Sequence, residues 1–128
     1  MQIRKILLLL LFLAAIGSGC GGLSAANSDQ ATLDALQNAG SDLTKVHPID
    51  FYFYHNEQLG AQQLCAALRD QGFQITVRSG AIEGEWLCLA SLNMVPSIDK
   101  FTELNSVFDE FIDLYGGEYD GWETVVIP

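Results

Sequence analysis

The sequence predicts an α+β domain with the ferredoxin-like βαββαβ order, in which a four-stranded antiparallel sheet carries two helices on one face. Three observations lead to this prediction. Segments in which apolar and polar residues alternate, as they do in half-buried strands, recur between residues 49 and 127. Two segments with helical spacing of apolar residues separate them in the order strand, helix, strand, strand, helix, strand. With 49% hydrophobic and 17% charged residues, the chain can bury a core.

The first half of the domain begins with a strand predicted over residues 49–54, where apolar side chains alternate with polar or amphipathic ones. Asn56 is a residue type that caps helix N-termini and Gly72 is one that ends helices, so a helix is predicted between them. Its apolar residues recur at helical spacing and are Ala61, Leu64, Cys65 and Leu68. We expect this side of the helix to face the sheet.

The second half adds strands over residues 73–78 and 85–92, separated by a turn that contains glycine. The later strand has apolar side chains on both faces, which is typical of a central strand. Ser97 then provides an N-cap for a second helix. The apolar stripe of this helix consists of Phe101, Leu104, Phe108, Phe111, Ile112 and Tyr115. A fourth strand is predicted over residues 118–127.

Residues 1–19 have the composition of an export signal. Two basic residues precede an uninterrupted apolar run over residues 6–16, which is too short to span a bilayer comfortably. Small residues then lead to Cys20, as in bacterial lipoprotein signals, where the cysteine thiol is acylated and becomes the new N-terminus. An ordinary signal-peptidase site at residues 24–26 is the alternative. We therefore expect an exported protein of the cell envelope, on the periplasmic side or at the outer membrane, anchored through lipid on Cys20 in the first case.

Residues 20–42 are rich in Gly, Ser, Ala, Asn and Asp, the composition of a flexible tether. Within them, Leu33, Leu36 and Ala39 have the spacing of one short helix, whose apolar face is too small to form a domain. The folded domain is therefore predicted over residues 43–128.

The chain is strongly acidic, with six Lys and Arg against sixteen Asp and Glu and a net charge of -10. Loss of Arg4 and Lys5 with the export signal makes it -12. Such a surface repels phosphates, so we predict no direct binding of nucleic acid; it favours a basic protein partner, or serves solubility alone. Tyr52 and Tyr54 are expected on the sheet face away from the helices, where they contact a partner or a terminal segment.

Catalytic and metal-binding chemistry has little support in the sequence. His47 and His55 flank the first strand, and there is no Cys-x-x-Cys, His-Glu-x-x-His or serine nucleophile motif. A metal site would need scattered ligands to converge through the tertiary fold. We therefore predict no catalytic residues, no metal and no cofactor.

Cys65 and Cys88 fall in the first helix and the third strand of the predicted domain. In this fold the helix crosses over that strand, and an exported domain meets oxidising conditions, so a disulfide is one interpretation. Two small buried thiols are the other.

The residues GGEYDGWET at positions 116–124 resemble the C-terminal signature of the regulator of ribonuclease activity B family, small bacterial proteins that bind and inhibit ribonuclease E. GSDLTK at positions 40–45, followed by a His-Pro strand start, and Gly-Glu-Trp at positions 84–86 are supporting similarities. The resemblance covers about residues 40–128. It implies a ferredoxin-like fold and a non-enzymatic role, in which the domain binds a protein and modulates its activity.

The sequence therefore predicts a protein-binding regulatory module tethered to the cell envelope. The resemblance implies ribonuclease E as partner, but that enzyme is inhibited in the cytoplasm, which an exported chain does not reach. Two alternatives stay open: a cytoplasmic inhibitor of ribonuclease E, if the N-terminus is not processed, and an envelope enzyme with an unrecognised site. The residues proposed to bind the partner are Tyr52, Tyr54, Tyr119, Asp120 and Trp122.

Overall fold

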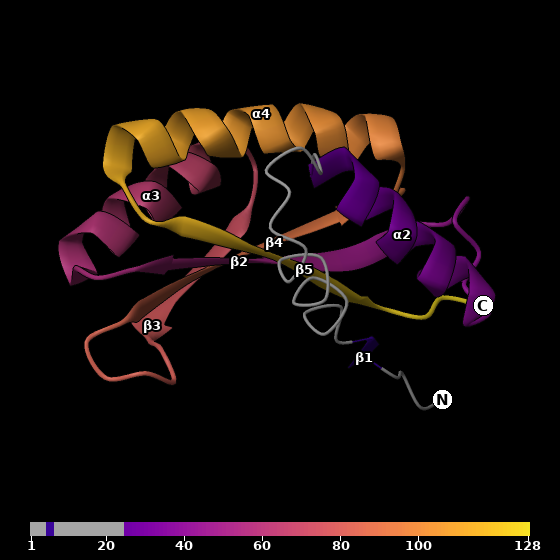
Figure 1. The fold of residues 1–128 in the computed structure, drawn as a ribbon, viewed down its shortest axis with the longest axis horizontal. Helices are drawn as coiled ribbons and strands as arrows, with labels where there is room; N and C mark the ends of the chain where they lie inside the picture. Colours follow the sequence, from indigo (N-terminus) through magenta and orange to yellow (C-terminus); the bar gives the residue numbers. More distant parts are fainter. Residues whose placement is uncertain (1–4, 7–24) are drawn as a thin grey trace. The chain divides into compact units, whose positions relative to one another are not determined.

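The computed structural model describes residues 5–6 and 25–128 of the chain (Figure 1). Their elements, in chain order, are β1 (Lys5–Ile6), α2 (Ala25–Asn38), β2 (His47–His55), α3 (Gln58–Asp70), β3 (Gln74–Ser79), β4 (Trp86–Met94), α4 (Ile98–Tyr115) and β5 (Glu118–Val125). The predicted export signal and Cys20 fall outside these residues, except for β1. None of the helices described has the length and hydropathy that crossing a membrane requires.

The strand order is that of the ferredoxin-like fold. The four-stranded antiparallel sheet has the order β5-β2-β4-β3, and β1 pairs with the outer edge of β5. Because β2 and β4 are the central strands, α3 and α4 must each cross the sheet to reach an edge strand. The predicted α+β class and four-stranded sheet are therefore confirmed.

Two compact units make up the described chain. The first comprises the described residues up to Ile49, together with Asn93–Asn105 and Glu123–Pro128. The second comprises Asp50–Leu92 and Ser106–Trp122. The division passes through β2, β4 and α4 and near the middle of β5, so each unit contains parts of several elements.

The core of the second unit is a cluster of aromatic rings. Phe51 and Phe53 of β2 are fully buried. The ring of Phe108 in α4 stands edge-on to both, with centroids 5.2 Å and 4.9 Å away. Tyr119 of β5 completes the cluster, 5.0 Å from Phe108. Because successive residues of a strand point to opposite faces, the two tyrosines of β2 lie on the side of the sheet away from this cluster.

Helix capping agrees with the prediction for α4 and differs for α3. The Ser97 side chain accepts a hydrogen bond from the Lys100 amide, 3.2 Å away, as an N-cap does. In α3 the N-cap is Glu57, not the predicted Asn56, and its side chain makes no capping bond. The Glu57 amide instead donates to Nδ1 of His55, 2.9 Å away. His55 thus accepts from the amide of the N-cap residue itself, whereas an N-cap side chain usually accepts from an amide in the first turn of the helix.

The first unit contains a helix where a flexible tether was predicted over residues 20–42. Leu33 and Leu36 of α2 are buried, and Oδ2 of Asp29 accepts a 2.8 Å hydrogen bond from Nδ2 of Asn105 in α4. Gly40, with a φ of 100°, follows the end of the helix. The short helix expected around Leu33 and Leu36 is therefore present, and it begins earlier, at Ala25. It differs from the predicted tether because burial of the two leucines and a hydrogen bond to α4 hold it in the fold.

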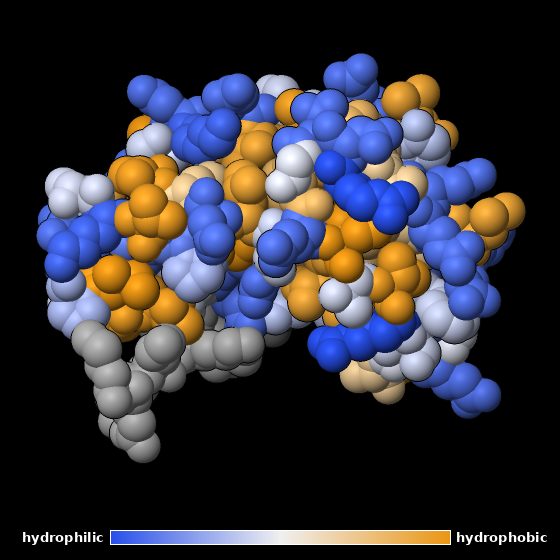
Figure 2. All heavy atoms as spheres, turned by 180° about the vertical axis from the view of Figure 1, so that it is seen from behind, coloured by the Kyte–Doolittle hydropathy of each residue, from blue (hydrophilic) through white to orange (hydrophobic). Residues whose placement is uncertain are grey.

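Large hydrophobic residues are also exposed in the described part of the chain. They are Val46, Leu59, Ile82, Val95 and Leu114. They come from different elements and loops, and Figure 2 shows hydrophobic residues interspersed with hydrophilic ones on the visible face. Single exposed residues of this kind are normal for a folded domain and carry no functional assignment.

Candidate protein-binding surface

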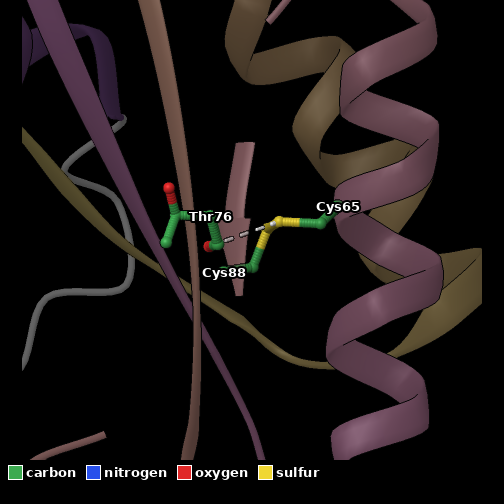
Figure 3. The surroundings of a disulfide bond; sticks show 3 residues. All are labelled: Cys65, Thr76 and Cys88. Carbon is green, nitrogen blue, oxygen red and sulfur yellow. Dashed lines mark hydrogen bonds between the residues drawn. A yellow bond between two sulfur atoms is a disulfide. The ribbon is translucent and has the colours of Figure 1, made fainter. Parts of the chain in front are cut away.

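A disulfide identifies the side of the sheet that α3 covers in the second unit. Sγ of Cys65 in α3 is bonded to Sγ of Cys88 in β4 at 1.98 Å, with the Cα atoms 5.7 Å apart (Figure 3). Cys88 lies opposite Val77 in the β3–β4 ladder, so both residues face α3. The next pair, Arg78 and Leu87, must then point to the other side. We call that other side of the second unit the open face.

The strand residues assigned to the open face by this alternation are Asp50, Tyr52, Tyr54, Gln74, Thr76, Arg78, Leu87, Leu89, Ser91, Glu118 and Asp120.

One of the two sulfur atoms also contacts the backbone of β3. Sγ of Cys65 lies 3.9 Å from the carbonyl oxygen of Thr76, the contact dashed in Figure 3. A sulfur in a disulfide carries no hydrogen, so we interpret this contact as packing rather than as a hydrogen bond. The sequence left two interpretations open for Cys65 and Cys88, a disulfide or two buried thiols. The structure contains the disulfide.

Tyr54 and Asp120 form an electrostatic cluster on the open face. Burial is the first cause that raises the pKa of the Tyr54 phenol, and the charges of Asp120 and Glu85 raise it further, while Arg78 lowers it. The pKa of Asp120 is likewise raised, first by burial and then by Glu118 and Glu85. Both side chains are half-buried. The cluster therefore combines an amphipathic ring with the partly desolvated carboxylate of Asp120 and the nearby charges of Glu85 and Glu118, and Arg78 is the basic residue that acts on Tyr54.

The open face continues along β2 toward β4. The Ser91 hydroxyl donates a 2.6 Å hydrogen bond to Oδ1 of Asp50, which ties the two central strands together on this side. Tyr52 lies between Asp50 and Tyr54 on the same side of β2 and is half-buried. The predicted pair of tyrosines is thus placed on one face together with Asp120.

The structure places the other two predicted binding residues differently. The Tyr119 ring packs in the core, with its centroid 5.0 Å from that of Phe53, so it lies on the side opposite Asp120. Trp122 is only 4% exposed. Tyr119 and Asp120 are adjacent in β5 and therefore point to opposite faces, which their shared motif does not show. Trp122 is two residues after Asp120, and it is its burial that leaves it little surface for a partner. Glu85 was not proposed as a binding residue, although the Gly-Glu-Trp similarity contained it.

Two glycines of the GGEYDGWET motif allow the chain to pass close to β2. Gly116 and Gly117 have φ values of 80° and 97°. A Cβ on Gly117 would lie 2.9 Å from the carbonyl oxygen of Tyr54 and 3.2 Å from Cδ2 of His55. Only glycine combines this backbone conformation with so close an approach. The glycines therefore position the start of β5, and with it Asp120, beside the end of β2.

His47 belongs to a buried network in the first unit. The ring is fully buried; Nδ1 donates to the Lys45 carbonyl oxygen at 2.7 Å, and Nε2 accepts from the Ser41 hydroxyl at 2.5 Å. The Ser41 oxygen also accepts a 2.9 Å hydrogen bond from the Ile127 amide. Both ring nitrogens are used, so this serine and histidine fasten the C-terminal segment and do not form an accessible catalytic pair.

His55 is also held by its neighbours. Nδ1 accepts from the Glu57 amide, so Nε2 carries the proton and donates to the Tyr115 carbonyl oxygen, 2.9 Å away. A Cβ on Gly60 would overlap the ring. His55 thus joins the start of α3 to the end of α4. In the parts of the chain that the structure describes, no three His, Cys, Asp or Glu side chains are grouped as a metal site.

A known protein family matches most of the chain. The model of the family described as regulator of ribonuclease activity B matches residues 26–124, from α2 into β5. No curated protein matches the sequence. The matched range includes the helix that replaces most of the predicted tether, so α2 belongs to the family's domain and precedes the boundary predicted at residue 43.

Proposed function

Because the chain belongs to the regulator of ribonuclease activity B family, we propose that it binds a protein partner through the open face and modulates that partner's activity. Regulators of this family act by binding and are not enzymes. The observation that carries the proposal is the cluster of Tyr54 and Asp120, which lies on the side of the sheet opposite α3 and in which the Asp120 carboxylate is partly desolvated and near further negative charges.

The charges of the cluster indicate the chemistry of the partner. The charges of Glu118 and Glu85 repel that of Asp120, and together with burial they raise its pKa. A Lys or Arg side chain from a partner would replace this repulsion with attraction, while a tyrosine ring offers it an apolar and cation-binding surface. We therefore infer a partner that presents basic residues.

We further propose that the protein works in the cell envelope, anchored through a lipid on Cys20. The basic and apolar composition of residues 1–19 supports export. The Cys65–Cys88 disulfide supports an oxidising compartment, since structural disulfides are rare in the cytosol. In that compartment the partner is an envelope protein and not ribonuclease E.

Inhibition of ribonuclease E in the cytoplasm is the second candidate function. The observation that favours it is the family match over residues 26–124. It requires that the N-terminus remain unprocessed. The two candidates share the binding surface and differ in the compartment, so they are separated by localisation.

The binding surface is tested by photo-crosslinking in cells that express the full chain. A photoreactive residue at Tyr52 is expected to give a discrete protein adduct, whereas the same residue at the exposed Gln63 of α3 gives none. Asp120→Lys is expected to abolish the adduct by reversing a charge on the open face. Asp109→Lys, the same change on an exposed residue of α4, is the matched control. Equal adducts at Tyr52 and Gln63, or equal effects of the two lysines, would contradict the proposed surface.

The compartment is tested by fractionation and by the variant Cys20→Ser. Wild-type protein is expected in the membrane fraction with an incorporated fatty acid, and Cys20→Ser is expected to lose both the lipid and the membrane association. Full-length, unprocessed protein in the cytosol, together with inhibition of purified ribonuclease E, would favour the second candidate instead.

A further inference from the structure

β3 is the last strand at one end of the sheet, and no described strand lies beyond it (Figure 1). Its side chains alternate between exposed and half-buried. The strand Gln74–Ser79 contains no proline or glycine, and Arg78 is its one charged residue. Proline, bulges and clustered charges are the features by which edge strands avoid pairing with other chains. β3 has few of them, so its outer edge is suited to accept another strand.

The ladder shows which backbone groups point to this outer edge. The Gly80 amide donates to the Glu85 carbonyl oxygen at 2.7 Å, and the register continues from this pair along β3 and β4 without a bulge. In an antiparallel ladder every second pair is hydrogen-bonded, so Thr76 bonds to β4. Ile75 and Val77 therefore direct their N–H and C=O groups away from β4.

We propose that β3 pairs antiparallel with β3 of a second copy of this chain, about a two-fold axis at Thr76. In this register Ile75 of one copy lies opposite Val77 of the other, and each such pair exchanges two main-chain hydrogen bonds through the outward groups. Thr76 lies opposite itself. Gln74 lies opposite Arg78, so the two arginines do not face each other.

In this register apolar side chains lie opposite apolar ones on one face of the sheet, and polar side chains lie opposite polar ones on the other. Ile75 and Val77 are half-buried on the α3 side and gain apolar neighbours from each other. On the open face the opposed side chains are polar. An isologous contact of this kind closes as a dimer, because each copy uses the same edge.

Charge favours a second copy at β3 over other parts of the surface. A chain with a net charge of -10 repels its own copy wherever acidic residues gather, as they do beside Tyr54. β3 carries no acidic residue. The dimer does not depend on the proposed partner or compartment.

Cysteine crosslinking in cells expressing the full chain tests this register. Residues opposed at a non-hydrogen-bonded position have Cα atoms about 4.5 Å apart, which is within the range of a disulfide. We expect Thr76→Cys to give a disulfide-linked dimer on oxidation. Gln74→Cys alone is the matched control, because its two copies lie roughly 13 Å apart. Co-expression of Gln74→Cys with Arg78→Cys is expected to restore the crosslink.

A second variant separates pairing from folding. Proline at Val77 removes an amide that faces outward, which an edge strand tolerates, and it blocks strand addition. We expect Val77→Pro to abolish the Thr76→Cys crosslink while the circular dichroism spectrum of the purified full chain is kept. A Thr76→Cys chain that stays monomeric under oxidant would overturn the proposal. Crosslinking that is equal at Gln74 and Thr76, or that survives Val77→Pro in a folded chain, would overturn it as well.

Discussion

Asp120 carries its charge where water is partly excluded and other carboxylates are near. Its pKa is raised above the usual 3.8, first by burial and then by Glu118 and Glu85. The folded state therefore binds this proton more tightly than the unfolded state does. Ionised Asp120 destabilises the fold at neutral pH, and this cost disappears as the pH falls through the folded pKa toward 3.8.

From this we predict that Asp120→Asn raises the free energy of unfolding at pH 7. The gain is expected to be below about 1 kcal/mol, because solvent screens a half-exposed group. It is expected to vanish near pH 3, where the aspartate is protonated in both states. Urea denaturation at both pH values measures it, with the exposed Asp109→Asn as control. An equal gain at the two pH values would show that the charge of Asp120 is not its cause.

The pKa of the Tyr54 phenol depends on the same group of charges. Burial, Asp120 and Glu85 hold its pKa above 10.0, so the folded protein keeps this phenol neutral to a higher pH than an exposed tyrosine. We predict that Asp120→Asn lowers the pKa of Tyr54 by removing one of the two negative charges. Absorbance titration of the tyrosinate, with Tyr54→Phe to identify its contribution, measures the change. A Tyr54 titration that Asp120→Asn leaves unaltered would place the carboxylate too far away to act on it.

Ser41 is a residue whose contribution to stability follows from its hydrogen bonds. It serves Nε2 of His47 and the amide of Ile127, both in a buried network. Ser41→Ala leaves these groups without their partner, so we predict a loss of about 1 to 3 kcal/mol in unfolding free energy. Thermal and urea unfolding measure the loss, and the exposed Ser79→Ala is the control. Equal stability of the two variants would mean that other groups or water replace the Ser41 bonds.

At the scale of the element, α2 decides where the domain begins. Its Leu36 is fully buried, and removal of a buried leucine side chain typically costs about 2 to 5 kcal/mol. We predict a loss in this range for Leu36→Ala and little change for Leu59→Ala, whose side chain is 63% exposed in α3. Denaturant unfolding of both variants measures the difference. If Leu36→Ala were as neutral as Leu59→Ala, residues 25–38 would act as a tether after all.

At the scale of the whole molecule, local pattern predicted the layers and missed the contacts between distant segments. The alternation of apolar and polar residues over positions 49–54 was enough to place Phe51 in the core and Tyr54 on the opposite face of the sheet. The apolar residues of α2 showed helical spacing at only a few positions. The sequence could not show that Leu33 and Leu36 are buried, because their burial depends on contacts with distant segments. The charge cluster joins β2, β5 and the turn before β4, so no single segment contains its pattern.

The disulfide bears on the stability of the whole fold. Cys65 and Cys88 are separated by 23 positions in sequence, and closing a loop of this size stabilises a protein by about 3 kcal/mol. We predict that reductant lowers the unfolding free energy of the wild-type chain by about this amount. The double variant Cys65→Ala/Cys88→Ala is expected to show the same loss and no response to reductant.

The same pair of cysteines provides the last prediction, on the state of the protein in cells. If the chain is exported, both sulfurs are oxidised, because envelope conditions preserve structural disulfides and the cytosol reduces them. Thiol labelling of acid-quenched cells, before and after reduction, is expected to modify Cys65 and Cys88 only after reduction. Deletion of residues 1–19 retains the chain in the cytosol and is expected to make both thiols reactive without reductant. Reactive thiols in the wild-type chain would instead favour the cytoplasmic function, while the fold and the open face would stand unchanged.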